Sequence, residues 1–227
     1  MFTATAFSSQ DIVRDGLVLW LDANDKTSYP DSGTVWRDLS LGGNDGALTN
    51  GPTFDSDNGG SIVFDGVNDY CSLPNLALNY PFHISFWGKA TSASSICGIT
   101  FTDPNSDTKS IGLQINTIQN NIRITYHDST FTSAFIPGYI NTIYKVSGNF
   151  TSTSFDLYVN GLYGASLSGA KTKIWTDTST SYNISLLNRP SIFYYSGNIY
   201  NTQIYNRALS ATEILQNYNA TKSRFGL

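Results

Sequence analysis

The clearest pattern in the chain is an alternation of side chains over Pro81–Lys89. A period of two places successive side chains on opposite faces of a β-strand. One face would carry Phe82, Ile84 and Phe86, and the other His83, Ser85 and Trp87. Apolar or alternating segments bounded by turn residues predict further strands at Gly16–Asp22, Ser110–Asn116, Asn121–His127, Phe155–Val159, Leu162–Leu167, Asn183–Leu187 and Ser191–Tyr205. Short strands at close intervals, with almost no helical pattern before residue 209, indicate a sandwich or barrel.

Two turn motifs join predicted strands. Asn160-Gly161 follows the strand at 155–159, and Asn-Gly is the preferred pair for a type I′ turn because both central residues adopt a positive φ. This motif predicts the clearest hairpin of the chain. In Asp57–Leu73 a strand ends in the turn Asp65-Gly66 and restarts at Asp69-Tyr70.

A single helix is predicted near the C-terminus. Ser210 at the N-cap and Glu213 three residues later form a capping box. Ile214, Leu215 and Tyr218 would give this helix an apolar side, which we expect to lie on the edge of the sandwich.

Length and charge restrict the function. The 227 residues suit one all-β domain, which we expect at 16–227, preceded by a polar, weakly patterned N-terminal arm at 1–15. Only 13% of residues are charged and the net charge is −4, with scattered Lys and Arg, whereas nucleic-acid binding needs clustered positive charge. No apolar run approaches the roughly 18 residues of a membrane helix, and the N-terminus does not resemble a signal peptide. Neither nucleic-acid binding nor membrane insertion is therefore expected.

Five motifs follow one another along the chain in a fixed order. They are Gly16–Ala23 (GLVLWLDA), Val35–Leu48 (VWRDLSLGGNDGAL), Gly60–Tyr70 (GSIVFDGVNDY), Leu157–Gly161 (LYVNG) and Ile204–Ser210 (IYNRALS). In this order they resemble the laminin-G-like jelly rolls of the concanavalin A-like lectin and glucanase superfamily. The resemblance implies an all-β, antiparallel two-sheet jelly roll with one short C-terminal helix. It also implies a binding module, because glycosidases are a minority of that superfamily.

Three longer segments resemble structural proteins of tailed bacteriophages. They are Asp15–Pro30, Asn50–Tyr70 and Leu215–Leu227. This resemblance implies a non-enzymatic protein on the virion surface, either a capsid decoration or a component of a head or tail fibre. Its partners would be capsid or fibre chains of the same particle, in several copies, with host-surface glycans as a further ligand. The alternative is a lectin or adhesin whose main role is sugar binding.

The carboxylates do not favour an enzyme. Retaining glycoside hydrolysis normally uses two carboxylates about 5 Å apart. The chain contains a single Glu, Glu213, which the capping box explains. Neither His83 nor His127 lies near a serine or cysteine nucleophile motif. A glycosidase therefore remains the less favoured alternative.

Three oxygen-rich turns are candidates for calcium, which takes six to eight oxygen ligands. The first contains Asp65, Asn68 and Asp69; the others contain Asp22, Asn24 and Asp25, and Asp55, Asp57 and Asn58. The alternative is that these side chains only accept backbone N–H groups and so form turns. Many members of the superfamily carry acidic residues where this chain has Tyr200 and Asn201. The resemblance therefore argues against a family calcium site that uses these two positions.

Aromatic rings that could stack on sugars are the remaining candidates. If the face of 81–89 that carries Trp87 and His83 is open, these two residues form a platform, with Tyr126, Tyr194 and Tyr195 as further candidates. If both faces of this strand are covered, Trp87 is a core residue instead.

The two cysteines allow two readings. Cys71 and Cys97 are expected to be buried thiols, or a bridge if their strands are neighbours.

Overall fold

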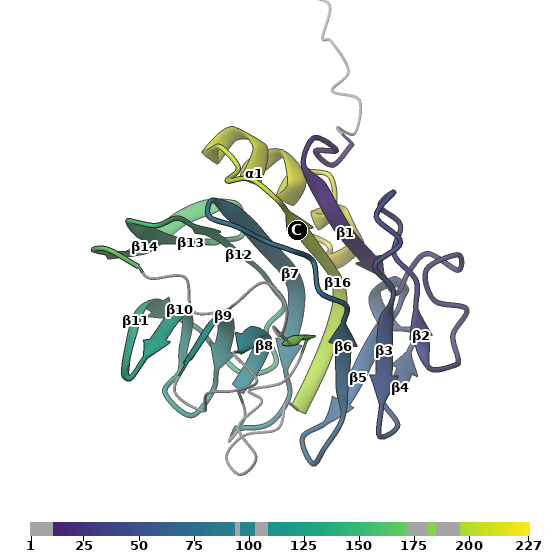
Figure 1. The fold of residues 1–227 in the computed structure, drawn as a ribbon. Helices are drawn as coiled ribbons and strands as arrows, with labels where there is room; N and C mark the ends of the chain where they lie inside the picture. The colour runs from purple at the N-terminus through teal and green to yellow at the C-terminus, as the bar shows by residue number, and fades with distance from the viewer. Residues whose placement is uncertain (1–10, 94–95, 103–108, 172–180, 185–195) are drawn as a thin grey trace, which may run out of the picture.

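Two antiparallel β-sheets pack face to face in the computed structural model, which describes residues 11–93, 96–102, 109–171, 181–184 and 196–227 (Figure 1). Every strand pairing among these residues is antiparallel. The predicted all-β two-sheet jelly roll with a short C-terminal helix is confirmed. Among the described residues, none of the helices has the length and hydropathy of a membrane span.

The first sheet, here called the helix-side sheet, has the order β14-β13-β12-β7-β16-β5-β4, with β1 also paired to β16. Its strands are β1 (Leu17–Asp22), β4 (Thr53–Asp55), β5 (Ser61–Asp65), β7 (Phe82–Ala90), β12 (Tyr144–Phe150), β13 (Ser154–Val159), β14 (Leu162–Ser168) and β16 (Ser196–Tyr205). The long strand β16 pairs with β7 on one edge and with both β5 and β1 on the other, so it lies at the centre of this sheet.

The second sheet, the opposite sheet, has the order β11-β10-β9-β8-β15-β6-β3-β2. Its strands are β2 (Val35–Trp36), β3 (Gly46–Thr49), β6 (Tyr70–Leu73), β8 (Ile96–Thr102), β9 (Lys109–Asn116), β10 (Asn121–Asp128), β11 (Thr130–Pro137) and β15 (Ser181–Ile184). Three helical elements complete the described chain: the 3₁₀ helix η1 (Asp57–Gly59), α1 (Ala211–Asn219) and the 3₁₀ helix η2 (Lys222–Phe225).

The core lies between the two sheets and follows the predicted alternation. Phe82, Ile84 and Phe86 point into it and are fully buried among the apolar residues of both sheets. Each such side chain contributes about 1.5–3 kcal/mol by leaving water. The predicted type I′ hairpin is also present, because Asn160 and Gly161 have φ of 52° and 80° between β13 and β14.

The outer face of the helix-side sheet is covered as well. Figure 1 shows α1 over this sheet, on the side away from β8–β11. Residues 11–15, here called the strap, lie against the same face: the Val13 N–H donates to Asn217 Oδ1 (2.8 Å) and the Tyr205 hydroxyl donates to the Val13 carbonyl (2.9 Å). Of the predicted arm at 1–15, the structure describes this strap alone, and the strap packs on the domain.

The capping box of α1 is present, but the predicted apolar side needs a correction. The Ser210 hydroxyl accepts from the Glu213 N–H, and the Glu213 carboxylate accepts from the Ser210 N–H (2.8 Å). Ile214 is buried as predicted, whereas Leu215 is 39% exposed. Asn217 is buried in its place, because its amide bonds to the strap and to the Tyr205 hydroxyl.

The cysteines form no bridge. Cys71 is a free, fully buried thiol, and burial raises its pKa. The strands that carry Cys71 and Cys97, β6 and β8, are separated by β15 and are therefore not neighbours. The bridge that neighbouring strands would have allowed is thus excluded.

Candidate functional site: a polar cavity under the strap

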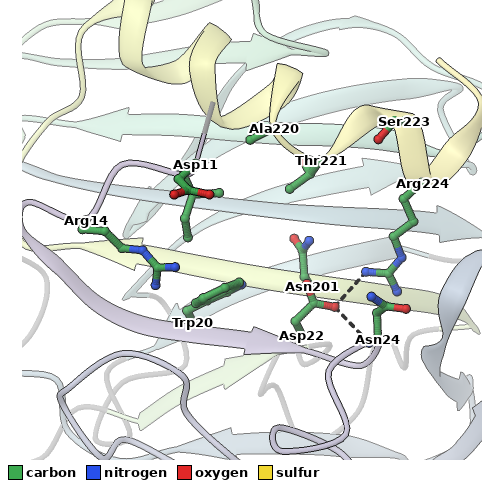
Figure 2. A pocket seen from close by; sticks show the side chains of 11 residues that line it. Asp11, Arg14, Trp20, Asp22, Asn24, Asn201, Ala220, Thr221, Ser223 and Arg224 are labelled. Atoms are coloured by element: carbon green, nitrogen blue, oxygen red, sulfur yellow. Dashed lines mark hydrogen bonds and ion pairs between the residues drawn. The ribbon is translucent and has the colours of Figure 1, made fainter. Parts of the chain in front are cut away.

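A polar cavity of about 270 Å³ lies on the outer face of the helix-side sheet (Figure 2). The strap supplies one wall, residues 220–224 supply the facing wall, and β1 and β16 form the floor. Segments from both ends of the described chain thus meet around one space.

The pairing of β1 with β16 sets the floor of the cavity. Asp22 lies opposite Asn201, and Trp20 lies opposite Gln203. Since side chains alternate along a strand, Trp20 and Asp22 share the outer face while Leu19 and Leu21 enter the core. This alternation in β1 was the available sequence signal for Trp20, which the sequence analysis missed.

Asn201 is the most unusual residue of the cavity. It is 1% exposed, yet neither its Oδ1 nor its Nδ2 forms a hydrogen bond with the described residues. Leaving buried polar atoms unsatisfied costs about 1–3 kcal/mol. Figure 2 shows its amide pointing from β16 into the space below Thr221. A ligand with both donors and acceptors would satisfy this amide.

Two acidic residues, Asp11 and Asp22, line the cavity, and an arginine neutralises Asp22. Asp22 Oδ1 accepts from Arg224 Nη1 (2.7 Å) and from the Asn24 N–H (2.9 Å). Arg224 also donates to the carbonyls of Asn58 and Gly60, which holds η2 against the loop after β4. Because this ion pair balances the charge, the inner part of the cavity suits a neutral, hydrogen-bonding ligand.

Trp20 supplies the aromatic surface of the cavity, and one face of its ring is occupied. The Arg14 guanidinium carbon lies 4.5 Å from the ring centroid, a cation–π arrangement. Ser223 adds a hydroxyl group to the opposite wall, whereas the Thr221 hydroxyl is bonded to the Trp87 N–H and the Asn217 carbonyl. An indole, an amide, carboxylates and a hydroxyl around one small space are groups that hydrogen-bond and stack with hydroxyl-rich molecules.

A family model described as the concanavalin A-like lectin/glucanases superfamily matches residues 65–215, more than half of the chain. The chain belongs to this superfamily. A search of curated proteins found no match to the sequence.

Solved structures of similar shape support the superfamily fold. Domain 4 of AbnA, an extracellular arabinanase from Geobacillus stearothermophilus, in complex with arabinotriose, superimposes with a TM-score of 0.73 at 14% identity, covering 91% of this chain and 100% of that one. Trypanosoma rangeli sialidase in complex with the inhibitor DANA gives 0.69 at 17% identity, covering 91% and 33%. The botulinum neurotoxin type G receptor binding domain gives 0.65 at 18% identity, covering 90% and 51%. This chain therefore spans about a third of the sialidase and about half of the neurotoxin domain.

The prediction that Trp87 and His83 form a sugar-binding platform is wrong. Trp87 is 0% and His83 1% exposed, because the outer face of β7 is covered. Phe225 packs on the Trp87 ring (4.3 Å between centroids). The Trp87 indole N–H donates to Thr221 Oγ1 (2.8 Å). The alternative interpretation, a core Trp87, is the correct one.

His83 has a structural role in the same layer. Its Nδ1 lies 2.8 Å from Asn149 Oδ1, which also accepts from the Leu209 N–H (3.0 Å). Because an amide oxygen only accepts, this contact places the imidazole proton on Nδ1. Burial is the main cause that lowers the pKa of His83 to about 3, so the ring is neutral at physiological pH.

Of the three predicted tyrosines, the structure describes Tyr126, which does not join these residues. Tyr126 lies on β10 in the opposite sheet, where it packs edge-on against Phe155 (5.7 Å between centroids) beside the main core. Tyr194 and Tyr195 lie outside the described residues.

The first calcium candidate is built as a turn. Asp65 Oδ1 accepts from the Val67 N–H (2.7 Å), and Asp69 Oδ2 accepts from the Asp65 N–H (3.1 Å). Asn68 is exposed beside them. Burial is the main cause that raises the pKa of Asp69. These bonds are the ones that the turn interpretation requires.

The other two oxygen-rich turns are also occupied by internal partners. Arg224 takes the place beside Asp22 that a cation would need, and Asp25 accepts from the Thr27 hydroxyl (2.6 Å). Asp55 accepts from the Asp57 N–H (2.9 Å). Across the described part of the chain, no group of three or more His, Cys, Asp or Glu side chains is placed to hold a metal ion.

Proposed function

We propose that this domain is a non-catalytic carbohydrate-binding module on the surface of a tailed-phage particle, and that its polar cavity holds one sugar residue. The observation that carries the sugar part is the buried Asn201 amide, which has no partner among the described residues and lies opposite Asp22 in a lining that also contains Trp20. The fold supports it, since a domain of the same shape was solved with arabinotriose.

The size of the cavity supports a single ring rather than an extended chain. Its volume of about 270 Å³ lies just below the roughly 300 Å³ at which pockets for drug-sized ligands begin. Longer glycans would then bind by one residue, with the remainder outside.

The carboxylates support a binding role. The single Glu, Glu213, bonds to Arg207 Nη2 (2.6 Å) and to Ser210, where it caps α1. Of the two carboxylates that line the cavity, Asp11 and Asp22, the second is already paired with Arg224. Glycoside hydrolysis needs one carboxylate to protonate the leaving group and a second to attack or to activate water.

A glycan array with the purified domain, run with calcium and again with a chelator, tests the sugar part. The best glycan is then titrated by calorimetry against the wild type, Asn201→Ala and the control Asn219→Ala. Asn219 is an exposed amide on α1 that does not line the cavity.

We expect Asn201→Ala to weaken binding about tenfold or more, because the hydrogen bonds of the amide to the sugar are lost. Its free energy of unfolding should stay within about 1 kcal/mol of the wild type, since the amide has no partner among the described residues and the lost packing of the side chain offsets the relief of its unsatisfied atoms. Asn219→Ala should bind as the wild type does. Absence of binding on the array, or equal binding by Asn201→Ala, would contradict the proposal. Loss of glycan binding in the presence of the chelator would restore the hypothesis of a calcium site.

The particle part of the proposal rests on the three segments that resemble phage structural proteins. Low charge and many Asn, Ser, Thr and Tyr residues suit packing against capsid or fibre chains through uncharged faces. Mass spectrometry of purified particles, with immunogold labelling, should find the protein in several copies on the surface. Its absence from purified particles would remove this part and leave a free lectin.

A further inference from the structure

A second, more apolar recess adjoins the polar cavity. It has a volume of about 280 Å³ and is lined by Arg14, Leu17, Leu39, Ser40 and Leu41. Arg14 lines both spaces and therefore stands between them. The loop that carries Leu39 is fixed beside Trp20, since the Leu39 N–H donates to the Trp20 carbonyl (2.7 Å) and the Trp20 N–H donates to Asp38 (2.8 Å).

The recess presents apolar surface to solvent. Leu41 is fully exposed, at 107% of its reference area, and Leu17 and Leu39 are partly exposed. Exposed leucines are common singly. Leu41, however, lines a recess together with two further leucines, and this recess adjoins a cavity of hydrogen-bonding groups.

Arg14 places hydrogen-bond donors at the border between the two spaces. Its guanidinium stacks on Trp20, and its side chain forms no hydrogen bond with another described residue. A guanidinium that stacks by its face keeps its N–H groups available along its edge, and it has no acceptor atom. A matching ligand has an acceptor at the border, hydroxyls on one side and a small apolar group on the other.

We propose that the preferred ligand is an acylated sugar, with the ring in the polar cavity, the acyl carbonyl oxygen on Arg14 and the acyl methyl group among Leu17, Leu39 and Leu41. This inference rests on the proposed carbohydrate-binding function and deepens it by naming the substituent. In an acetyl group the carbonyl oxygen and the methyl group are bonded to the same carbon atom. The oxygen can therefore accept from Arg14 at the border while the methyl group enters the recess.

Calorimetric titration with matched sugar pairs tests the proposal: N-acetylglucosamine against glucose, and N-acetylgalactosamine against galactose. The wild type should prefer the acylated member of at least one pair about tenfold or more, since it gains a charge-assisted hydrogen bond and a buried methyl group. Saturation-transfer NMR should show transfer from the protein to the acetyl methyl protons.

Two variants and a control locate the effect. Leu41→Ser should reduce the preference several-fold and leave the affinity for the plain sugar nearly unchanged. Arg14→Gln should also reduce the preference several-fold, and because Arg14 lines the polar cavity as well, its affinity for the plain sugar is measured beside it. Leu162→Ser, at an exposed leucine on β14 (67%), is the matched control and should keep the full preference. Leu41 is fully exposed, so its variant is expected to fold.

Different failures have different meanings. Equal affinity for acylated and plain sugars would overturn this inference and leave the carbohydrate-binding proposal standing. A preference that survives both Leu41→Ser and Arg14→Gln would also overturn it, because another part of the protein would then read the acyl group. Absence of binding to every sugar would overturn the proposed function itself, and the inference with it.

Discussion

Folding brings the titration of Lys145 close to neutral pH. This lysine is 1% exposed on the outer face of β12, in a cross-strand row with Trp87, Asn201 and Asp22. Its Nζ donates to Gln203 Oε1 (3.1 Å). Burial lowers its pKa to about 7, while the charge of Asp22 acts in the opposite direction. An ammonium group beneath the helical layer is therefore close to its titration point at neutral pH.

Stability should rise with pH relative to a Lys145→Met variant. The unfolded chain keeps this lysine protonated up to about pH 10.5, whereas the folded chain releases the proton above about pH 7. Between these values the unfolded state binds more protons, so the free energy of unfolding increases with pH, by at most about 1.4 kcal/mol per unit. Urea denaturation at pH 6, 7, 8 and 9 measures the difference, with the exposed Lys26→Met as control. A difference that stays constant from pH 6 to 9 would refute the shift.

At the level of elements, α1 depends on an acid-sensitive cap. Arg207 donates to Glu213 Oε1 (2.6 Å), and Ser210 donates to Glu213 Oε2 through its N–H (2.8 Å). The bond from Arg207 is the main cause that lowers the pKa of Glu213 to about 2. The helix that covers His83 and Tyr205 is thus stabilised by an ionised carboxylate.

We expect Glu213→Gln to lower the melting temperature at pH 6 and to lose this effect in acid. The folded pKa lies below the unfolded one, so the stabilisation is present above about pH 4.5 and disappears as pH falls toward 2. Thermal unfolding of both proteins from pH 6 to 2.5 should show converging melting temperatures. Ser210→Ala, which removes the other half of the box, should cost about 1 kcal/mol. A gap between wild type and Glu213→Gln that persists at pH 2.5 would contradict this account.

Strands were predictable where one face is polar and the other apolar, or where a turn motif marks the end. β7 and the hairpin β13–β14 satisfy these conditions. β12 was missed, because its outer-face residues Lys145, Ser147 and Asn149 are polar yet buried under the helical layer. β11 was missed as well, since it is an edge strand with exposed aromatic residues such as Phe135 and lacks a sharp polar face. Local pattern does not reveal which polar faces are later covered.

For the whole molecule, the sequence motifs predicted the sandwich, because they occur along most of the chain. The cavity could not be predicted in the same way. Arg14 and Arg224 are far apart in sequence, and only the β1–β16 register and the docking of the strap bring them to one space. The signal for Asn201 was present as a departure from its relatives, but it was read as a missing metal ligand.

Arg224 joins three distant parts of the molecule, so its removal should loosen more than one of them. Its guanidinium contacts Asp22 of β1 and the carbonyls of Asn58 and Gly60, while its own helix covers Trp87. We expect Arg224→Met to lower the free energy of unfolding by about 1–3 kcal/mol, because partly buried acceptors lose a charged donor. Hydrogen exchange should accelerate at 57–60 and 222–227 together.

The exposed Arg37→Met is the control for this change and should leave both segments protected. Exchange that accelerates at 222–227 alone would show that Arg224 does not hold the loop at 57–60.

The position of the strap and of β1 also has a mechanical consequence. The start of β1 lies beside the end of β16, with Leu17 opposite Tyr205. A pull that separates residue 11 from the end of β16 would first detach the strap from α1 and then unzip β1 from β16 pair by pair, rather than shear the whole ladder at once. The walls and floor of the cavity would thus separate while the two sheets still hold, and the proposed sugar binding would respond to tension before the fold does.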